Sequence, residues 1–366
     1  MFSLWVTNAQ SYLPVHAKGV CVIGHSKIFY CAIPYLFVVY AIRVRKKDAE
    51  RTRKKLVKGG LLDDRWSIVE DGDFIIFPVK RKIDGSEEFH LPPREKKISP
   101  YQKIKKIIED ERIPDFWEKI GDIILLPPFP QYKKKGKIVG EAFAKVLKAK
   151  TVAAYIGTEG ELRKPKVEIL YGKDTETVHI ENGIRYKLDI ARIMFSSGNV
   201  DERIRMGRMN VQGEIIVDLF AGIGYFTLPL AKYGKAKKVY ACEKNPVAIW
   251  YLIENLKLNS IQNVIPVLGD NRKVAPMHIA DRVILGYIHT DKFLNLGFNV
   301  LKKSGGVIHY HDTFTSEELE WKPGQNLKYY GKKNGFRVEI LRKKRIKSYA
   351  PHIWHVVVDA RAIPKD

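Results

Sequence analysis

Short apolar runs and helix-like stretches alternate from residue 201 to the C-terminus of the chain. Such an alternation predicts a doubly wound α/β sheet, with parallel strands inside and helices on both faces. The expected strands are 215–217, 238–241, 264–268, 282–285 and 306–310, and the expected helices include 226–232 and 246–259. Two further strands, 336–341 and 355–360, are expected to close the sheet as an antiparallel pair.

Residues 41–92 have the pattern of a small basic α/β domain. A predicted helix over 48–58 stops at Gly59, and two short runs of β-branched and aromatic residues follow it. These runs predict strands over 66–69 and 74–79. A basic, proline-containing run after this domain is interpreted as a linker that leads into a helix.

A second α+β domain is predicted over residues 98–200. Its expected strands are 122–126, 152–156, 167–171, 177–180 and 186–190, and its expected helix is 140–148. Glu181-Asn182-Gly183 is a hairpin-turn signal between the last two strands. The lysines 133–135 precede the helix on a predicted loop, where contact with RNA and a solvated loop are equally good interpretations.

Residues 1–40 differ from the rest of the chain. The run 31–42 is strongly apolar, but it is too short to span a bilayer and Pro34 interrupts it. The first ten residues hold no Lys or Arg, which argues against a signal peptide. Two interpretations stay open: a membrane-associating tail or, preferred here, a true translation start further along the chain. We expect no stable association with a membrane.

The first strand of the predicted sheet leads directly into a glycine turn. Asp218 ends the strand, and Gly222 and Gly224 form the turn within the sequence DLFAGIGYF, residues 218–226. A strand, a glycine turn and a helix N-terminus make the nucleotide-binding corner of an open α/β sheet. The preceding carboxylate and aromatic, and the incomplete pyrophosphate fingerprint, favour S-adenosylmethionine (SAM) over a purely structural turn. The pattern therefore predicts a Rossmann-like sheet of the class I SAM-dependent methyltransferase type.

Acidic and amide side chains end the next two predicted strands. Glu243 follows the second strand, where an acid accepts hydrogen bonds from the two ribose hydroxyls of a nucleotide. Asp270 and Asn271 follow the third strand, where a carboxylate and an amide can read the adenine amino group and a ring nitrogen. These three side chains complete the expected adenosine site.

The fourth strand lacks the Asn or Asp that many enzymes of nitrogen methylation place at its end. It ends Leu285-Gly286-Tyr287, so Gly286 is expected to leave open space and Tyr287 to offer a ring. The site is therefore poorly suited to ordinary nitrogen methylation. His309 and His311 share one face of the next strand, and we interpret them as a polar edge because no third metal ligand is suitably spaced.

The charge balance predicts a polyanionic partner. The 366 residues include 64 Lys and Arg against 41 Asp and Glu, a formal net charge of +23. This excess favours nucleic acid, with a highly charged solvated surface as the alternative. The basic run 342–347 is a candidate contact with RNA backbone. Cys21, Cys31 and Cys242 are too few and too scattered for a zinc cluster or a disulfide framework, which indicates a reducing, cytoplasmic compartment.

These motifs together resemble the wybutosine-pathway tRNA aminocarboxypropyltransferases of archaea and eukaryotes. The resemblance covers about residues 100–362 and is carried by Met194–Ser196, Asn199, Glu202-Arg203, DLFAGIGYF, Glu243, Asp270-Asn271, Gly286-Tyr287, IHYH at 308–311 and SYAPHIWHVVVD from Ser348. Related tRNA guanosine-37 N1-methyltransferases have Asn-Leu-Pro at the fourth strand and Phe-Ser-Pro-Arg where this chain has residues 195–198. Both departures favour aminocarboxypropyl transfer. Residues 41–92 resemble, less closely, the small domain that those methyltransferases use on the tRNA body.

The resemblance implies transfer of the 3-amino-3-carboxypropyl group of SAM to C7 of 4-demethylwyosine at position 37 of tRNA(Phe), with methylthioadenosine released. Arg203 is the expected cation for the donor carboxylate, and Ser196 is expected to assist it. The full set of expected SAM-binding residues is Ser196, Arg203, Asp218, Phe220, Ala221, Gly222, Gly224, Glu243, Lys244, Asp270, Asn271 and Gly286. Tyr287 and His289 are catalytic candidates without an assigned role, and no metal is expected. The alternatives are tRNA guanosine-37 N1- or wyosine methylation, and a non-catalytic SAM-fold RNA-binding protein.

Overall fold

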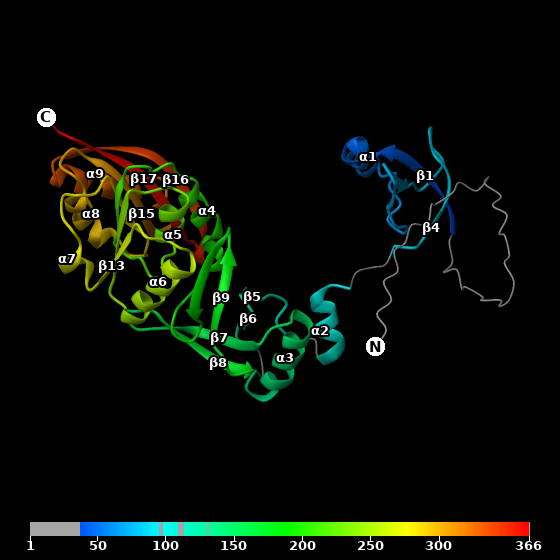
Figure 1. The fold of residues 1–366 in the computed structure, drawn as a ribbon, viewed down its shortest axis with the longest axis horizontal. Helices are drawn as coiled ribbons and strands as arrows, with labels where there is room; N and C mark the ends of the chain where they lie inside the picture. Colours follow the sequence, from blue (N-terminus) through cyan, green and yellow to red (C-terminus); the bar gives the residue numbers. More distant parts are fainter. Residues whose placement is uncertain (1–36, 95–97, 109–112, 130–131, 366) are drawn as a thin grey trace. The chain divides into compact units, whose positions relative to one another are not determined.

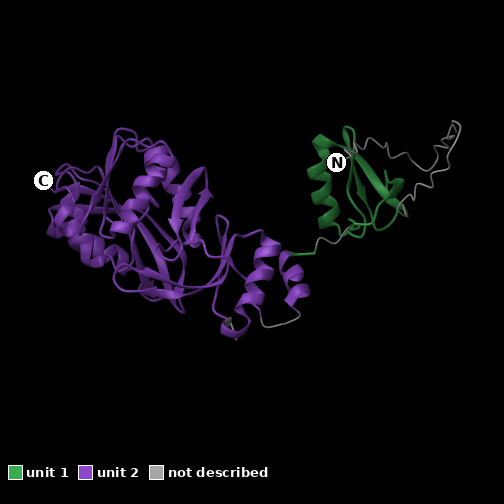
Figure 2. Ribbon diagram, turned by 60° about the horizontal axis from the view of Figure 1, so that its bottom comes forward, with its two compact units in different colours: residues 1–99 green, residues 100–366 purple. Residues whose placement is uncertain are grey.

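The computed structural model describes residues 37–94, 98–108, 113–129 and 132–365. The chain divides into two compact units, residues 1–99 and 100–366 (Figure 2). Most of the predicted tail, residues 1–36 with Cys21 and Cys31, lies outside the described residues. No helix in the described ranges is both long and apolar enough to cross a bilayer.

The first unit is a four-stranded antiparallel sheet in the order β2-β3-β1-β4. Its elements are β1 (Phe37–Arg45), α1 (Lys46–Lys58), β2 (Val69–Asp71), β3 (Phe74–Pro78) and β4 (Glu87–Leu91). The end of the apolar run 31–42 therefore belongs to an inner strand of this sheet, and residues 37–40 are not a separate tail. Strand β4 escaped prediction because charged residues begin it, although Phe89 and Leu91 are buried in the core.

The second unit begins with a mixed four-stranded sheet in the order β5-β6-β7-β8, followed by a separate hairpin of β9 and β10. These elements are α2 (Pro100–Ile108), β5 (Glu118–Ile120), β6 (Ile123–Leu126), α3 (Tyr132–Leu147), β7 (Thr151–Glu159), β8 (Lys164–Tyr171), β9 (Glu176–Glu181) and β10 (Ile184–Asp189). The hairpin turn predicted at Glu181–Gly183 is confirmed, with positive φ at Asn182 and Gly183.

Helix α3 begins eight residues earlier than predicted, so Lys133–Lys135 lie in its first turn and not on a loop. Glycines in the helix made the prediction start late, because glycine disfavours a helix interior. Their structural reason is close packing. A Cβ on Gly140 would lie 2.9 Å from the backbone of Leu170 in β8.

The rest of the second unit is a seven-stranded sheet in the order β13-β12-β11-β14-β15-β17-β16 (Figure 1). Its strands are β11 (Ile215–Asp218), β12 (Lys238–Glu243), β13 (Val264–Leu268), β14 (Arg282–Leu285), β15 (Gly306–Thr315), β16 (Phe336–Ala350) and β17 (Ile353–Pro364). The first five strands are parallel and the last two are antiparallel, which confirms the predicted α/β class and the closing pair. The strand order reverses between β11 and β14, and ligands bind at such a switch point.

Helices flank this sheet: η1 (Ser197–Asn199), α4 (Val200–Arg208), α5 (Thr227–Lys232), α6 (Pro246–Leu258), α7 (Asn271–Val274), η2 (Asp291–Phe293), α8 (Leu294–Val300) and α9 (Lys322–Lys333). The last strands are longer than predicted. The basic run 342–347 continues β16 at the edge of the sheet, where lysines and arginines discourage pairing with another chain.

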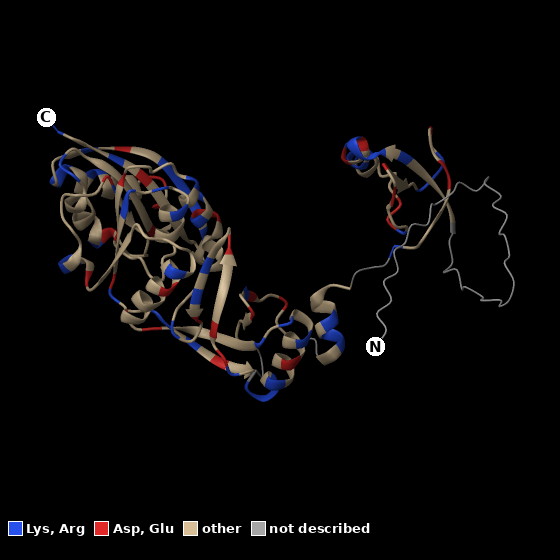
Figure 3. Cartoon of the chain, viewed as in Figure 1, with Lys and Arg blue, Asp and Glu red and all other residues tan. Residues whose placement is uncertain are grey.

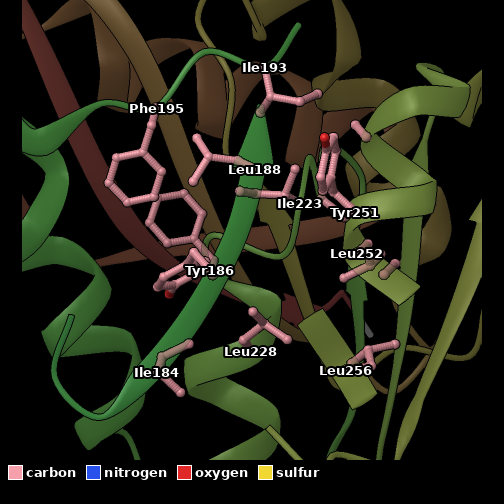
Figure 4. Packing of buried hydrophobic residues seen from close by; sticks show 14 of the residues in the cluster. Ile184, Tyr186, Leu188, Ile193, Phe195, Ile223, Leu228, Tyr251, Leu252 and Leu256 are labelled. Atoms are coloured by element: carbon pink, nitrogen blue, oxygen red, sulfur yellow. The ribbon is translucent and has the colours of Figure 1, made fainter. Parts of the chain in front are cut away.

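One hydrophobic core crosses the predicted boundary between residues 200 and 201. Strand β10 contributes Ile184, Tyr186 and Leu188 to the same cluster as Leu228 of α5 and Leu252 of α6 (Figure 4). The hairpin β9–β10 therefore packs as part of the large sheet's helical layer. This packing fixes the segment that follows β10, residues 190–199, against the carboxyl ends of the strands.

Candidate active site

A cavity of about 340 Å³ opens at the carboxyl ends of β11 to β14. Its size lies within the range of small-ligand sites. The expected SAM or catalytic residues that line it are Ser196, Arg203, Phe220, Gly222, Glu243, Lys244, Asp270, Asn271, Gly286, Tyr287 and His289. The structure thus brings residues from five separate segments of the chain to one hollow.

Glu243 is held by backbone amides at the end of β12. The N–H of Gly222 donates to Oε2 and the N–H of Asn245 donates to Oε1, both at 2.8 Å. Burial raises the pKa of Glu243, and these backbone hydrogen bonds oppose the rise. Each carboxylate oxygen keeps a further lone pair, so Glu243 can still accept hydrogen bonds from two hydroxyls.

Three expected SAM contacts, Asp218, Ala221 and Gly224, are not among the residues that line the cavity. Asp218 is fully buried and accepts hydrogen bonds from Thr227 Oγ1 at 2.8 Å and from the N–H of Phe220 at 3.2 Å. Burial raises the pKa of Asp218 to about 7. The carboxyl group therefore ties the glycine turn to α5, and a β carbon at Gly224 would clash with Leu228.

Asp270 and Asn271 line the cavity but already have protein partners. Asp270 caps α7 and accepts hydrogen bonds from Arg272, at 3.0 Å from its backbone N–H and 2.9 Å from Nε. Asn271 donates from Nδ2 to the carbonyl oxygen of Leu219 at 2.9 Å. This bond fixes the amide plane of Asn271 and leaves Oδ1 as its acceptor.

The wall formed by the end of β14 is apolar and closely packed. The ring of Tyr287 stacks on Phe220, with ring centroids 5.3 Å apart and planes 17° from parallel. A β carbon on Gly286 would lie 2.8 Å from two ring carbons of Phe226. The expectation that Gly286 leaves open space was therefore wrong, because the Phe226 ring fills it.

Arg203, which also lines the cavity, is buried and paired within the protein. Its Nε and Nη2 donate to the two carboxylate oxygens of Glu181, and its Nη1 donates to the carbonyl oxygen of Ser196. Burial alone would raise the pKa of Glu181, but hydrogen bonds from Arg203 and His179 hold it at about 2. The charge of Arg203 is thus balanced by Glu181, which the sequence offered only as a turn residue.

Arg163 also lines the cavity, although no sequence pattern predicted a role for it. It lies between β7 and β8, with its guanidinium carbon 5.9 Å from the centroid of the Tyr287 ring. Its Nη2 lies 3.5 Å from the sulfur of Met194, and its Nε has no hydrogen-bond partner among the described residues. Arg163 lies at a hairpin tip that is rich in charged residues, so its sequence context is the same as that of a solvent-exposed arginine.

His309 and His311 are buried beneath the cavity wall. His309 Nδ1 lies 2.6 Å from Asp359 Oδ1, and its Nε2 lies 2.8 Å from Arg282 Nη1. The His311 ring packs against Phe226, and burial lowers the pKa of His311 to about 3. His309 fits the interpretation as a polar group of the fold, because both of its ring nitrogens have partners. His311 fits it only in part, because its Nε2 has no hydrogen-bond partner among the described residues. Within the described ranges, no cluster of His, Cys, Asp or Glu could hold a metal ion.

Family models match three consecutive segments of the chain. Residues 41–87 match the tRNA methyltransferase 5 N-terminal domain, residues 102–175 the TYW2 N-terminal domain, and residues 177–341 the TRM5/TYW2 methyltransferase domain. The second and third segments both lie in the second unit, and together they contain every residue that lines the cavity.

Characterised relatives agree with these matches. A Methanocaldococcus jannaschii protein named tRNA(Phe) (4-demethylwyosine(37)-C(7)) aminocarboxypropyltransferase is 49% identical over 67% of this chain and 97% of its own length. The Pyrococcus abyssi tRNA (guanine(37)-N(1))-methyltransferase Trm5b is 35% identical over 88% of this chain and 98% of its own. The crystal structure of Pyrococcus horikoshii TYW2 in complex with MeSAdo superimposes with a TM-score of 0.65 at 40% identity, and covers 72% of this chain and 98% of that one. The chain therefore belongs to the TRM5/TYW2 family, with the tRNA aminocarboxypropyltransferases of wybutosine synthesis among its relatives.

Proposed function

We propose that this protein transfers the 3-amino-3-carboxypropyl group of SAM to C7 of 4-demethylwyosine at position 37 of tRNA(Phe). The observation that carries the proposal is the apolar wall at the end of β14, where Gly286 packs on Phe226 and Tyr287 stacks on Phe220. An enzyme that methylates a ring nitrogen needs a polar group there to hold the nitrogen, whereas a carbon nucleophile needs none. The similarity to a named aminocarboxypropyltransferase supports the same reaction.

The donor would be held along the carboxyl ends of the strands. Glu243 would accept hydrogen bonds from the ribose hydroxyls, and Asn271 Oδ1 would accept one from the adenine amino group. The amino-acid end of SAM would then point toward Ser196 and Arg203, at the opposite end of the cavity. Positioning decides the outcome, since the sulfonium activates all three of its carbons and only the one facing the nucleophile reacts.

The reaction is a displacement at the γ-carbon of the methionine moiety. A bond forms between base C7 and this carbon while the bond from the carbon to sulfur breaks. The electron pair of the broken bond stays on sulfur, which leaves neutral methylthioadenosine. The ring proton at C7 is then lost to water or to a neighbour such as His289, which lines the cavity.

The acceptor base must leave its stack to reach the donor. Tyr287 offers a ring face at the cavity, and the Arg163 guanidinium lies over that ring. An aromatic ring and a planar cation are the groups on which proteins stack a flipped base. We therefore assign the base to this side of the cavity, opposite the adenosine contacts.

Methylation of guanosine 37 at N1 is the second candidate function. One observation favours it: the first unit matches the N-terminal domain of tRNA methyltransferase 5, and the similarity to Trm5b spans 88% of this chain. Both reactions use SAM and tRNA, and they differ in the by-product. Methyl transfer leaves S-adenosylhomocysteine, whereas aminocarboxypropyl transfer leaves methylthioadenosine.

The test follows from this difference. SAM labelled in its carboxyl carbon is incubated with the protein and, in separate reactions, with tRNA(Phe) carrying either 4-demethylwyosine or unmodified guanosine at position 37. We expect label in the RNA and methylthioadenosine in equimolar amount. S-adenosylhomocysteine with unlabelled RNA would establish the methyltransferase, and SAM binding without any product would leave a non-catalytic RNA-binding protein. We expect the reaction to occur in the cytoplasm, given the scattered cysteines.

A further inference from the structure

The turn from Ser196 to Asn199 holds two polar features that the contacts above do not use. Lys347 of β16 donates a hydrogen bond to Ser196 Oγ. Asn199 Oδ1 is buried and has no hydrogen-bond partner among the described residues. Both Ser196 and Asn199 line the cavity. A hydroxyl that accepts a hydrogen bond from a cation can donate its own proton to a carboxylate, and an acceptor without a partner can bind an ammonium group. The turn is therefore complementary to a zwitterion, which carries both groups.

Lys347 reaches this turn because residue 198 is glycine. A β carbon on Gly198 would lie 2.9 Å from Lys347 Cδ and 3.4 Å from its Nζ. The space that a side chain at residue 198 would occupy is therefore filled by a lysine from a strand almost 150 residues later. Strand β16 has register shifts on both sides of Lys347, so it departs from regular pairing at this point.

This end of the cavity carries more positive than negative charge. Arg203 is balanced by Glu181, and Glu118 accepts a hydrogen bond from Ser197 Oγ at 2.7 Å. Lys347 forms no ion pair with a carboxylate in the described part of the chain. Burial lowers the pKa of Lys347, Glu118 opposes this, and Arg203 and Arg163 lower it further. A partly buried ammonium in such surroundings is stabilised by a bound anion.

We propose that Lys347, acting through Ser196, and Asn199 together bind the amino-acid end of SAM. The inference rests on the proposed function, which turns that end of the donor toward this turn. The Ser196 hydroxyl accepts from Lys347 and donates its own proton to the α-carboxylate. Asn199 Oδ1 accepts from the α-ammonium group, and turning its amide to do so breaks no existing bond of that oxygen. Holding the tail here while Glu243 holds the ribose fixes which carbon of the sulfonium faces the acceptor.

The Asn199 side chain is free for this task because it does not cap α4. Asn199 occupies the N-cap position, but its side chain forms no capping hydrogen bond. A change to leucine at this position therefore removes an acceptor without removing a cap. Lys347 is a positioning residue, and its contribution has to be separated from a general effect on folding.

A calorimetric titration with three ligands, without tRNA, distinguishes a positioning role of Lys347 from a general effect on folding. SAM and S-adenosylhomocysteine carry the amino-acid end, and methylthioadenosine lacks it. We expect Lys347→Met and Asn199→Leu each to weaken binding of SAM and S-adenosylhomocysteine by about tenfold, the size of one charge-assisted hydrogen bond. Affinity for methylthioadenosine should stay at the wild-type value. Lys344→Met, which removes an exposed lysine from the same strand, is the matched control and should change neither.

Three results would overturn the inference. Unchanged SAM affinity in both variants would assign the carboxylate to Arg163 or Arg203. An equal loss for methylthioadenosine would make the effect structural. Weaker tRNA binding of Lys347→Met in a separate titration, together with normal SAM binding, would make its anion an RNA phosphate. These three results are binding measurements and do not depend on which product the enzyme makes. If the activity assay gave S-adenosylhomocysteine, the proposed function would be rejected, and the binding titration would still test the roles of Lys347 and Asn199.

Discussion

Arg203 and Glu181 form a two-pronged ion pair, with Nε 2.7 Å from Oε1 and Nη2 2.6 Å from Oε2. The arginine side chain is 2% exposed and the glutamate side chain 11%. The pair joins the end of β9 to helix α4, and Arg203 also donates to the carbonyl oxygen of Ser196. It therefore fixes the turn that is proposed to bind the amino-acid end of SAM.

This pair makes the stability of the fold depend on acid pH. The pKa of Glu181 is about 2 in the folded protein against an ordinary 4.5. A lowered pKa means that the stabilisation is complete above about pH 4.5 and is lost as the pH falls toward 2. At 1.36 kcal/mol per unit, the contribution is about 3 kcal/mol. We expect Glu181→Gln to be destabilised relative to wild type at pH 7, and the two stabilities to converge near pH 2.

Urea unfolding of both proteins across this pH range measures the convergence. Glu254→Gln serves as the control, because Glu254 pairs with Lys257 at the surface of α6. Its difference from wild type should show no comparable dependence on pH, since surface ion pairs contribute little. A gap between wild type and Glu181→Gln that stays constant down to pH 2 would contradict the prediction.

Glu243 should matter equally for ligands with and without an amino-acid end. Because it is proposed to hold the ribose, Glu243→Ala should weaken binding of SAM and of methylthioadenosine by the same factor. That factor is roughly 10- to 100-fold for the loss of hydrogen bonds to a charged group. Glu243→Gln keeps one acceptor oxygen, so its affinity for both ligands should lie between those of wild type and Glu243→Ala. Titration calorimetry measures these affinities. A loss of affinity for SAM alone would show that Glu243 does not bind the ribose.

Much of the large sheet was predictable because each signal there is local. Strands β13 and β14 begin and end where the apolar runs do, Asp218 and Glu243 end β11 and β12, and Pro246 begins helix α6. The same locality brought Glu243, Asp270 and Asn271 to one cavity, since the carboxyl ends of parallel strands must meet at one edge. The predicted adenosine side of the site therefore followed from topology alone.

The other side of the cavity depends on contacts between distant segments, which no local pattern encodes. Glu181 ends a hairpin strand, Arg163 lies at a charged hairpin tip, and Lys347 sits in a basic edge strand. Each has the sequence context of a solvated surface residue. The shared core between β10 and helices α5 and α6 brings the hairpin's segment to the sheet, and that packing is a tertiary property.

Gly286 should tolerate no side chain. Because a β carbon there would lie 2.8 Å from the Phe226 ring, Gly286→Ala should destabilise the protein by about 1–3 kcal/mol, the usual range for overpacking. Combining it with Phe226→Leu should cost less than the sum of the two single changes, since the smaller side chain relieves the clash. Urea unfolding of the four proteins measures this coupling.

The control for this set of four proteins is Gly324→Ala. Gly324 lies in α9, and the nearest atom to its added β carbon is 4.0 Å away, in Ile340. Alanine there should be neutral or stabilising, by about 0.5–1 kcal/mol, because glycine disfavours helix. Additive effects of Gly286→Ala and Phe226→Leu would show that the ring does not limit the space at residue 286.

Two exposed lysines in the first turn of α3, Lys133 and Lys134, are expected to contact tRNA. Positive charge at a helix N-terminus is unfavourable within the protein and favourable beside a phosphate. Lysines are also frequent on the neighbouring helix α2 (Figure 3). Replacing both lysines by alanine should weaken tRNA binding at low salt and reduce the slope of log K against log salt by about two.

The matched control removes the same charge elsewhere on the second unit. Lys237 and Lys238 are exposed at the amino end of β12, the opposite end of that strand from Glu243 and the cavity. Replacing both by alanine should leave the salt slope within error of wild type, because only phosphates in contact release counterions on binding. If both double variants lowered the affinity and the salt slope equally, the effect would come from net charge, and α3 would not be part of the tRNA contact.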